Sequence, residues 1–505
     1  MSMMRFYLQF LFICLCCTLS LPGLSREITL VKDSMSRELY RPAFHFTPES
    51  GWMNDPNGIV FYNGLYHPYY QYVPIWMYGK KGAGKHWGHA TSKDLMHWKH
   101  EPIALGMHPI YGGAPSGNMA IDWDNRSELQ NGKEKVFCCY FAQRNPETKQ
   151  SMLMMAFSTD GGMSFTRKET PVHVVPEGKK RYDPDIFWFE KEKKWVMVVS
   201  EHLSKFVFFE STNLKKWKEF YTFDYSTEYQ EMWDCVDMYP IKVEEHPGII
   251  KWIISFSTFT RTEGQYTKQA YLVGDFDGKK FTPDTKRYQF FDQGPDMYGG
   301  ITWSEIPNNE RRIFIAWGGN WRGNGNKIPT KPWWGAQTLP REVTLHLTEK
   351  GYRLYNQPVK EYKCLRDGKI KSSDTLPSQY ELVYTIDRSR DSKTILSNAI
   401  GERIIFGYKA MVDSFYFDRS QAGQFDRKVK FPGYHSFKIE SQEKHLKIRV
   451  LVDHSMAELF INDGEYTMSE QFFPEKPYQK MQMIPLASDL EIWKLRNIWF
   501  GSDKE

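Results

Sequence analysis

The sequence predicts an all-β protein, a five-bladed β-propeller followed by a C-terminal β-sandwich. Three observations support this prediction. Short aromatic and β-branched runs bounded by Gly, Pro, Asn and Asp recur along the chain, whereas helical periodicity is scarce. A turn motif returns at a spacing that suits propeller blades. After Leu354 the pattern changes to alternating segments and a tight hairpin, as expected of an antiparallel sandwich.

The first 25 residues are predicted to be a signal peptide. Arg5 supplies positive charge, residues 6–21 are apolar, and Gly23 and Ser25 provide the small residues of a cleavage site after Ser25. The apolar run is short for a membrane span, and no later run reaches 18 residues. A signal anchor is the alternative. We therefore expect a secreted, extracellular protein with no membrane segment after cleavage.

A repeated turn motif predicts the blades over residues 41–350. Its copies begin at Ser92, Ser158, Ser211 and Gly274, and each follows an apolar run, supplies a Ser or Asx turn and ends with an aromatic ring. The starts lie 53 to 66 residues apart, a period that suits a four-stranded blade. A series of hairpins that share turn chemistry is the alternative.

Residues 366–505 are predicted to form the sandwich. Alternation of apolar and polar residues marks segments 380–386, 404–412 and 446–452, and Asn462-Asp-Gly464 suits a tight hairpin turn. This part lacks an obvious cluster of convergent acidic residues. We therefore expect it to be structural or accessory.

Composition excludes several classes of protein. Of the 505 residues 41% are hydrophobic and 25% charged, which is typical of a globular chain. The 66 basic and 61 acidic residues leave a net charge of +5 without a long run of either sign, so neither a nucleic-acid partner nor an anionic membrane surface is predicted. Aromatic residues reach 16%, which suits both strands and sugar binding.

Cysteine and histidine positions argue against a disulfide scaffold and a metal site. Three of the seven cysteines fall within the signal peptide. Cys138 and Cys139 are neighbours on a predicted strand and face opposite sides, as do His86 and His89. Asn125 begins an N-glycosylation sequon, which is consistent with secretion.

Three aspartates are the candidate catalytic residues. Asp55 stands in Trp52-Met-Asn-Asp-Pro-Asn-Gly58, where the following proline confines it to extended geometry and flanking asparagines can keep it ionised. Asp183 precedes Pro184, and Asp234 lies among Trp, Met and Cys, which desolvate a carboxyl and raise its pKa. One ionised and one protonated acid are the working pair of a retaining glycosidase. A turn at Asp55 and surface positions for the other two are the alternatives.

The segment Trp52-Met-Asn-Asp-Pro-Asn-Gly58, with Leu65-Tyr-His and Tyr70-Gln-Tyr72 after it, resembles the opening signature of glycoside hydrolase family 32. That family contains the invertases, inulinases and levanases. The likeness continues in order through His86-Trp-Gly-His-Ala90, Ser116-Gly117, Gly274-Asp-Phe-Asp-Gly278, 292–298, Leu339-Pro-Arg341, Phe417-Asp-Arg-Ser420, Asp453-His-Ser455 and Glu458-Leu-Phe460. The resemblance implies a five-bladed propeller that carries the site and a β-sandwich behind it.

The resemblance also implies residue roles. Asp55 matches the nucleophile that attacks a β-fructofuranoside, Asp183 the transition-state stabiliser and Asp234 the acid/base. The positions that match sugar-contacting residues are Asn54, Gln71, Trp87 and Ser116, with Trp76 as a further candidate. No metal or organic cofactor is required.

Two departures from the family pattern bear on activity. Tyr182 stands where the family usually has Arg before Asp183, and Arg181 is one place earlier, on the other strand face. The Tyr182 phenol is therefore a candidate substrate contact. Asp234 stands where Glu is usual, so its carboxyl is pulled back by about 1.5 Å. A misplacement near 1 Å can cost roughly a hundredfold in rate. Glu231, three residues away along a strand, is expected to point to the opposite face.

These observations favour a secreted, retaining β-fructofuranosidase that acts on sucrose or short fructans. A catalytically silent sugar-binding protein on the same scaffold is the first alternative, because two positions are altered. A fructosyltransferase is the second, because transfer and hydrolysis differ only in the acceptor site. The sequence leaves open the preferred substrate and the oligomeric state.

Overall fold

The computed structural model describes residues 38–75, 84–229, 231–259, 267–321, 328–423 and 433–499. Within them the regular structure consists of 34 strands and four short 3-10 helices, so the all-β prediction is confirmed. None of the helices in these ranges is long and apolar enough to cross a membrane. The predicted signal peptide lies outside the described residues.

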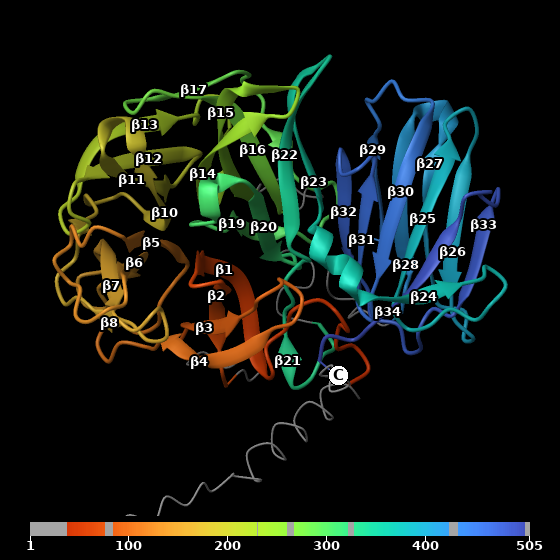
Figure 1. Cartoon of the computed structure of the whole chain (residues 1–505), viewed down its shortest axis with the longest axis horizontal. Coiled ribbons are helices and arrows are strands. Elements are labelled where there is room, and N and C mark those ends of the chain that lie inside the picture. Colours follow the sequence, from red (N-terminus) through yellow and green to blue (C-terminus); the bar gives the residue numbers. More distant parts are fainter. Residues whose placement is uncertain are drawn as a thin grey trace, which may run out of the picture.

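The N-terminal strands form five consecutive antiparallel groups arranged about one axis (Figure 1). The first contains β1 (Gly51–Tyr62), β2 (Leu65–Val73), β3 (His86–Thr91) and β4 (Lys99–Leu105), with β21 (Trp333–Trp334) parallel to β1. The second contains β5 (Gly117–Asp122), β6 (Val136–Arg144), β7 (Ser151–Ser158), β8 (Thr166–Arg167) and β9 (His173–Val174). The third contains β10 (Arg181–Phe189), β11 (Lys194–Glu201), β12 (Lys205–Ser211) and β13 (Lys218–Asp224).

The last two groups join into one sheet through a parallel pair, Val243 with Leu345. The fourth group contains β14 (Met232–Val243), β15 (His246–Phe259), β16 (Lys268–Phe276), β17 (Phe281–Pro283) and β18 (Gln289–Phe290). The fifth contains β19 (Tyr298–Thr302), β20 (Arg312–Trp317), β22 (Arg341–Thr348) and β23 (Gly351–Pro358). Short 3-10 helices lie at η1 (Glu190–Glu192), η2 (Pro307–Asn309), η3 (Lys360–Leu365) and η4 (Ala410–Val412).

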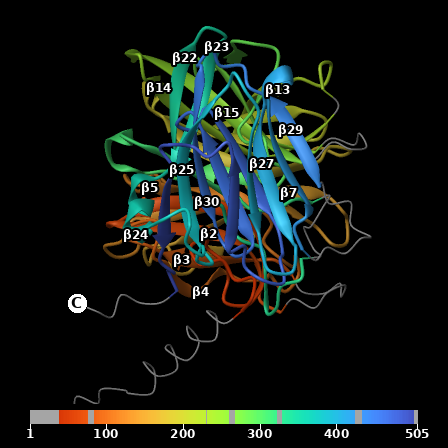
Figure 2. The ribbon, with the colours of Figure 1, turned by 90° about the vertical axis from the view of Figure 1, so that its right-hand side faces the viewer.

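The C-terminal part consists of two sheets (Figure 1). One has the order β24 (Arg366–Ile370), β34 (Glu491–Leu495), β25 (Tyr380–Asp387), β30 (His445–Val452), β31 (Met456–Ile461) and β32 (Tyr466–Gln471). The other has the order β29 (Tyr434–Lys438), β28 (Ser414–Gln421), β27 (Arg403–Lys409), β26 (Ser392–Ser397) and β33 (Lys480–Ile484). Figure 2 brings these strands to the front, with the propeller strands behind them.

The repeated sequence motif forms the same turn in each of its first three copies. Ser92, Ser158 and Ser211 each accept the backbone N–H two residues later on the side-chain hydroxyl. The Asp or Asn residue that lies two positions after each serine then accepts further backbone N–H groups of the turn on its side chain. In the looser fourth copy Asp277 does the same with Lys279 and Lys280. Each turn joins the third and fourth strands of its group, which explains the spacing of the copies.

Apolar side chains from neighbouring strand groups meet in separate clusters. Cys138 belongs to the cluster between the second and third groups, and Cys139 to the one between the first and second. The two cysteines therefore face opposite sides, as predicted, and both are free. Successive side chains of a strand point to opposite faces, so each strand packs one face against the strand group before it and the other against the group after it.

A buried ionic network joins the propeller to the sandwich. Arg341 of β22 donates to Asp292 at 3.0 Å and to Glu458 of β31 at 2.7 Å. His45 lies 3.1 Å from Glu458 and 2.8 Å from Asp453. Burial would lower the pKa of His45, but hydrogen bonds to these two carboxylates raise it to about 9. Such charges are stable in the interior only when paired, so both parts are needed to satisfy them.

Candidate active site

Four inner strands of the propeller carry an extra residue near their beginning. The pairing register shifts between Met53 and Pro56 in β1, between Tyr182 and Asp185 in β10, between Asp234 and Asp237 in β14, and between Tyr298 and Ile301 in β19. Bulges of this kind bend a strand and re-aim its side chains. The three candidate aspartates all lie in or beside these bulges, at one end of the inner strands.

Asp55 is nearly buried, and each carboxylate oxygen has a distinct environment. The Ser116 hydroxyl donates to Oδ2 at 3.0 Å. Oδ1 has no hydrogen-bond partner among the described residues. Gly299 passes so close that a Cβ there would lie 2.4 Å from Oδ1, and its φ of +66° also favours glycine. One oxygen is thus fixed and the other is left for a ligand.

Asp183 adopts the left-handed region with φ +49°, which is unusual for a non-glycine residue. The backbone N–H of Cys235 donates to its Oδ2 at 3.1 Å, and Cys235 is itself left-handed with φ +49°. Burial raises the pKa of Asp183, and the nearby carboxyls of Asp234 and Asp55 raise it further, while Lys85 opposes them. Strained backbone that the fold maintains at clustered acids is typical of functional sites.

Asp234 is held by Tyr298. The phenol donates to Asp234 Oδ2 at 2.7 Å, while Oδ1 has no partner within the described ranges. Burial raises the pKa of Asp234 to about 6 against the hydrogen bond from Tyr298, and Asp55 adds to the rise. A carboxyl with this pKa can give up a proton near neutral pH, as a general acid must.

The three carboxyls therefore share one desolvated site. Burial raises the pKa of both Asp183 and Asp234, so these two carboxyls hold a proton to higher pH than exposed aspartates do. The buried polar atoms here that have no partner in the described part of the chain are Asn54 Nδ2, Asp55 Oδ1, Tyr182 Oη and Asp234 Oδ1. Donors and acceptors left together in this way suit a ligand with several hydroxyl groups.

Two of the predicted sugar contacts are packed behind the site. Gln71 and Trp87 are fully buried, and their N–H groups donate to Ala114 O at 3.0 Å and Pro115 O at 2.9 Å. These bonds fix the backbone that leads into Ser116. The structure thus gives Gln71 and Trp87 a positioning contact. Trp76 lies outside the described residues.

The altered positions have separate surroundings. Arg181 donates to Glu201 at 2.8 Å and to Glu219 at 2.9 Å within its own group of strands. Tyr182 faces Asp234 and Asp183, whose charges raise the pKa of the phenol beyond the rise caused by burial. Glu231 accepts from Tyr288 at 3.2 Å, consistent with the expectation that it points away from the site.

Sequence reasoning missed Tyr298 and Gly299. Tyr298 belongs to the segment that carried the resemblance, but nothing in its spacing relates it to a carboxyl 64 residues earlier. The pair Gly299-Gly300 was the available signal, since adjacent glycines within a strand indicate a bulge or a close approach.

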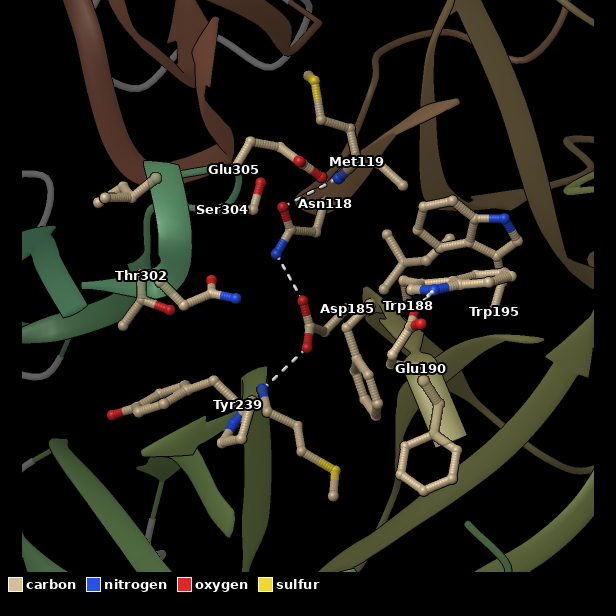
Figure 3. A pocket seen from close by; sticks show the side chains of 18 of the residues that line it. Asn118, Met119, Asp185, Trp188, Glu190, Trp195, Tyr239, Thr302, Ser304 and Glu305 are labelled. Atoms are coloured by element: carbon tan, nitrogen blue, oxygen red, sulfur yellow. Dashed lines mark hydrogen bonds between the residues drawn. The ribbon is translucent and has the colours of Figure 1, made fainter. Parts of the chain in front are cut away.

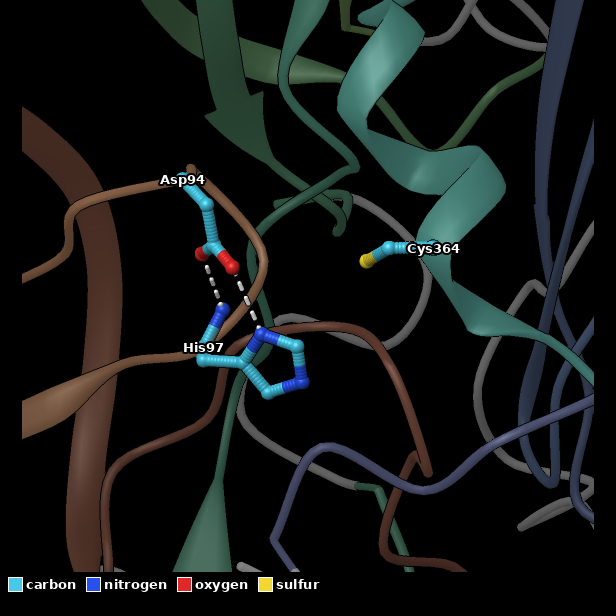
Figure 4. Close-up of side chains that lie close together, drawn as sticks. All are labelled: Asp94, His97 and Cys364. Carbon is cyan, nitrogen blue, oxygen red and sulfur yellow. Dashed lines mark hydrogen bonds and ion pairs between the residues drawn. The ribbon is translucent and has the colours of Figure 1, made fainter. Parts of the chain in front are cut away.

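A group of metal-ligating side chain types lies away from this site, at Asp94, His97 and Cys364 (Figure 4). Asp94 already accepts the N–H groups of Met96 and His97 on Oδ1 and the His97 ring on Oδ2 at 2.7 Å. The carboxylate therefore closes the repeated turn motif. These contacts account for the Asp94–His97 pair without an ion.

Comparisons with known proteins find relatives that match both parts of the chain. Residues 45–358 match the model described as glycosyl hydrolases family 32 N-terminal domain, and residues 354–494 match the one described as glycosyl hydrolases family 32 C terminal. A levanase of Bacillus subtilis is 33% identical over 92% of this chain and 71% of its own length. An invertase of Debaryomyces hansenii is 29% identical over 93% and 94% of the two chains.

The crystal structure of exo-inulinase from Aspergillus awamori superposes with a TM-score of 0.82 at 24% identity, over 91% of this chain and 99% of that one. This likeness covers both parts of the chain. The prediction of a β-propeller followed by a β-sandwich is confirmed.

Proposed function

Because the chain belongs to glycosyl hydrolase family 32, we propose that it is a secreted, retaining β-fructofuranosidase that hydrolyses sucrose or short fructans. The convergence of three carboxyls, the buried Asp55 and the half-buried Asp183 and Asp234, carries the proposal. The relatives with levanase and invertase activity in their names support a fructosyl substrate.

In the first step Asp55 attacks the anomeric carbon of the fructosyl unit through its free Oδ1. Its other oxygen stays bonded to Ser116, which limits rotation of the carboxylate. Asp234 transfers its proton to the glycosidic oxygen as that bond breaks. The products are a fructosyl ester on Asp55 and the released sugar.

In the second step Asp234, now ionised, accepts a proton from water as the water oxygen attacks the same carbon. The ester bond to Asp55 breaks, and fructose leaves with its original anomeric configuration. Asp183 hydrogen-bonds the fructosyl hydroxyls during both steps. The Tyr182 phenol takes the place of the usual Arg contact.

The first test is the release of glucose and fructose from sucrose by purified residues 26–505, with Asp55→Asn as the paired control. We expect turnover that disappears in the control. NMR of the first product should show β-fructofuranose before mutarotation, since the proposed mechanism retains configuration. An α-anomer would contradict the assigned roles.

If the chain does not hydrolyse sucrose, three further results would each point to a different function. Activity on inulin or levan alone would redefine the substrate. Folded protein that binds these sugars without cleaving them would favour the silent sugar-binding alternative. Transfer of fructose to added sugar in place of water would favour the fructosyltransferase alternative.

A second test addresses the short acid/base residue. Asp234→Glu adds the methylene that the family usually has at this position. The rate is expected to rise, by up to about a hundredfold if the carboxyl is misplaced by near 1 Å. An unchanged or lower rate would mean that the pocket around Tyr298 is adapted to the shorter side chain.

A further inference from the structure

A second cavity lies on the same inner strands, beyond the catalytic group (Figure 3). Its volume is about 1180 Å³, and none of the three catalytic aspartates lines it. Asp185 and Asp237 do line it, and they follow Asp183 and Asp234 by two and three residues. Along a strand this is roughly 7 to 10 Å. The cavity is therefore a separate space at the other end of the inner strands.

Four tryptophans line this cavity. Trp188, Trp195 and Trp252 lie along it, and Trp123 lies at its edge with 46% of its surface exposed. The Trp123 N–H donates to Glu305 at 2.8 Å, which fixes the ring while it stays accessible. An indole face that is accessible and held in place is a stacking platform for a sugar ring.

The floor of the cavity is polar. Asp185 accepts from the Asn118 side chain at 2.6 Å and from the Met238 N–H at 2.8 Å (Figure 3). Asp237 accepts from the Thr302 N–H at 3.1 Å. A carboxylate oxygen that accepts one hydrogen bond can accept a second, so Asp185 and Asp237 can both accept further hydrogen bonds.

We propose that this cavity is a second carbohydrate site, which binds an uncharged oligosaccharide through Trp123 and the two buried aspartates. The Arg312 guanidinium lines the cavity together with Asp185 and Asp237, so the polar floor carries both acidic and basic groups and favours neither an anion nor a cation. An apolar ligand would leave this polar floor unsatisfied. An indole face on which a sugar ring can stack, together with polar groups that can bind its hydroxyls, suits a neutral sugar.

The test is isothermal titration of full-length Asp55→Asn chain, which prevents turnover, with an inulin-type fructo-tetrasaccharide. The choice of this probe rests on the proposed function, so maltotetraose and cellotetraose are titrated in parallel. One of these sugars is expected to show a binding event that Trp123→Ala weakens about tenfold. Trp123→Phe, which keeps an aromatic face at this position, should weaken it less, by about threefold.

Trp493→Ala, on the sandwich, is the matched control and should leave every binding event intact. Melting temperatures establish that each variant is folded. The proposal is wrong if none of the sugars shows a binding event that depends on Trp123. Sucrose turnover by the unaltered chain tests the proposed function separately, so the two failures can be told apart.

Discussion

The hydrogen bond from Tyr298 to Asp234 makes a quantitative prediction about pH dependence. Tyr298→Phe removes a 2.7 Å bond that stabilises the ionised carboxyl. A hydrogen bond to a charged group is worth about 1.5 to 3 kcal/mol, and one pKa unit corresponds to about 1.4 kcal/mol. The pKa of Asp234, already raised to about 6, should therefore rise by a further 1 to 2 units, approximately.

The measurement is kcat/KM for sucrose against pH, because its limbs report ionisations in the free enzyme. Asp234 must be protonated to act as the acid, so activity should fall as pH rises past its pKa. In Tyr298→Phe this alkaline limb should move upward by about 1 to 2 pH units. Tyr271→Phe is the matched control, because that buried phenol donates to Gln289 at 3.0 Å away from the site. An alkaline limb that stays in place would refute the assignment of the limb to Asp234.

Three further changes test the site and the fold. Gly299→Ala brings a Cβ within 2.4 Å of the proposed nucleophile and should lower kcat by about a hundredfold or more, whereas Gly64→Ala, with open space around it, should not. Glu458→Gln removes one of the two buried carboxylates that Arg341 and His45 each contact and should lower the free energy of unfolding by about 3 kcal/mol in denaturant titrations; a loss below about 1 kcal/mol would contradict this. Burial lowers the pKa of His67 to about 4 and that of His89 to about 3, so neither affects stability above pH 6.5, and below it each costs about 1.4 kcal/mol per pH unit down to its folded pKa, because only the unfolded chain takes up the proton. Denaturant titrations of His89→Gln should show a shallower loss on acidification than the unaltered chain.

The sequence was sufficient to select three aspartates as candidate catalytic residues because each stands in a local motif. Asp55 and Asp183 precede prolines, and Asp234 is flanked by Trp and Cys. The repeated turn was also predictable, since Ser and Asx side chains close it by bonds within a few residues. Local chemistry of this kind does not depend on how distant segments pack.

Contacts between distant segments were not predictable in this way. Tyr298 and Asp234 meet because two inner strands lie side by side, which spacing does not indicate. Strict period-two alternation holds from Arg181 to Tyr182, so the opposite directions of those side chains were foreseen. It fails from Asp183 onward, where the bulge adds a residue.

The sandwich also contributes to the geometry of the site, beyond the accessory role expected of it. Strand β32 holds the segment before β19: Gln293 N–H donates to Thr467 O at 2.7 Å, and Ser469 N–H donates to Asp292 at 2.9 Å. Tyr298, the first residue of β19, follows this segment and donates a hydrogen bond to Asp234. Because the buried network at Arg341 and the start of β19 depend on the same interface, we infer that the sandwich stabilises the position of the phenol. The proposed acid/base chemistry is therefore a property of both parts of the chain.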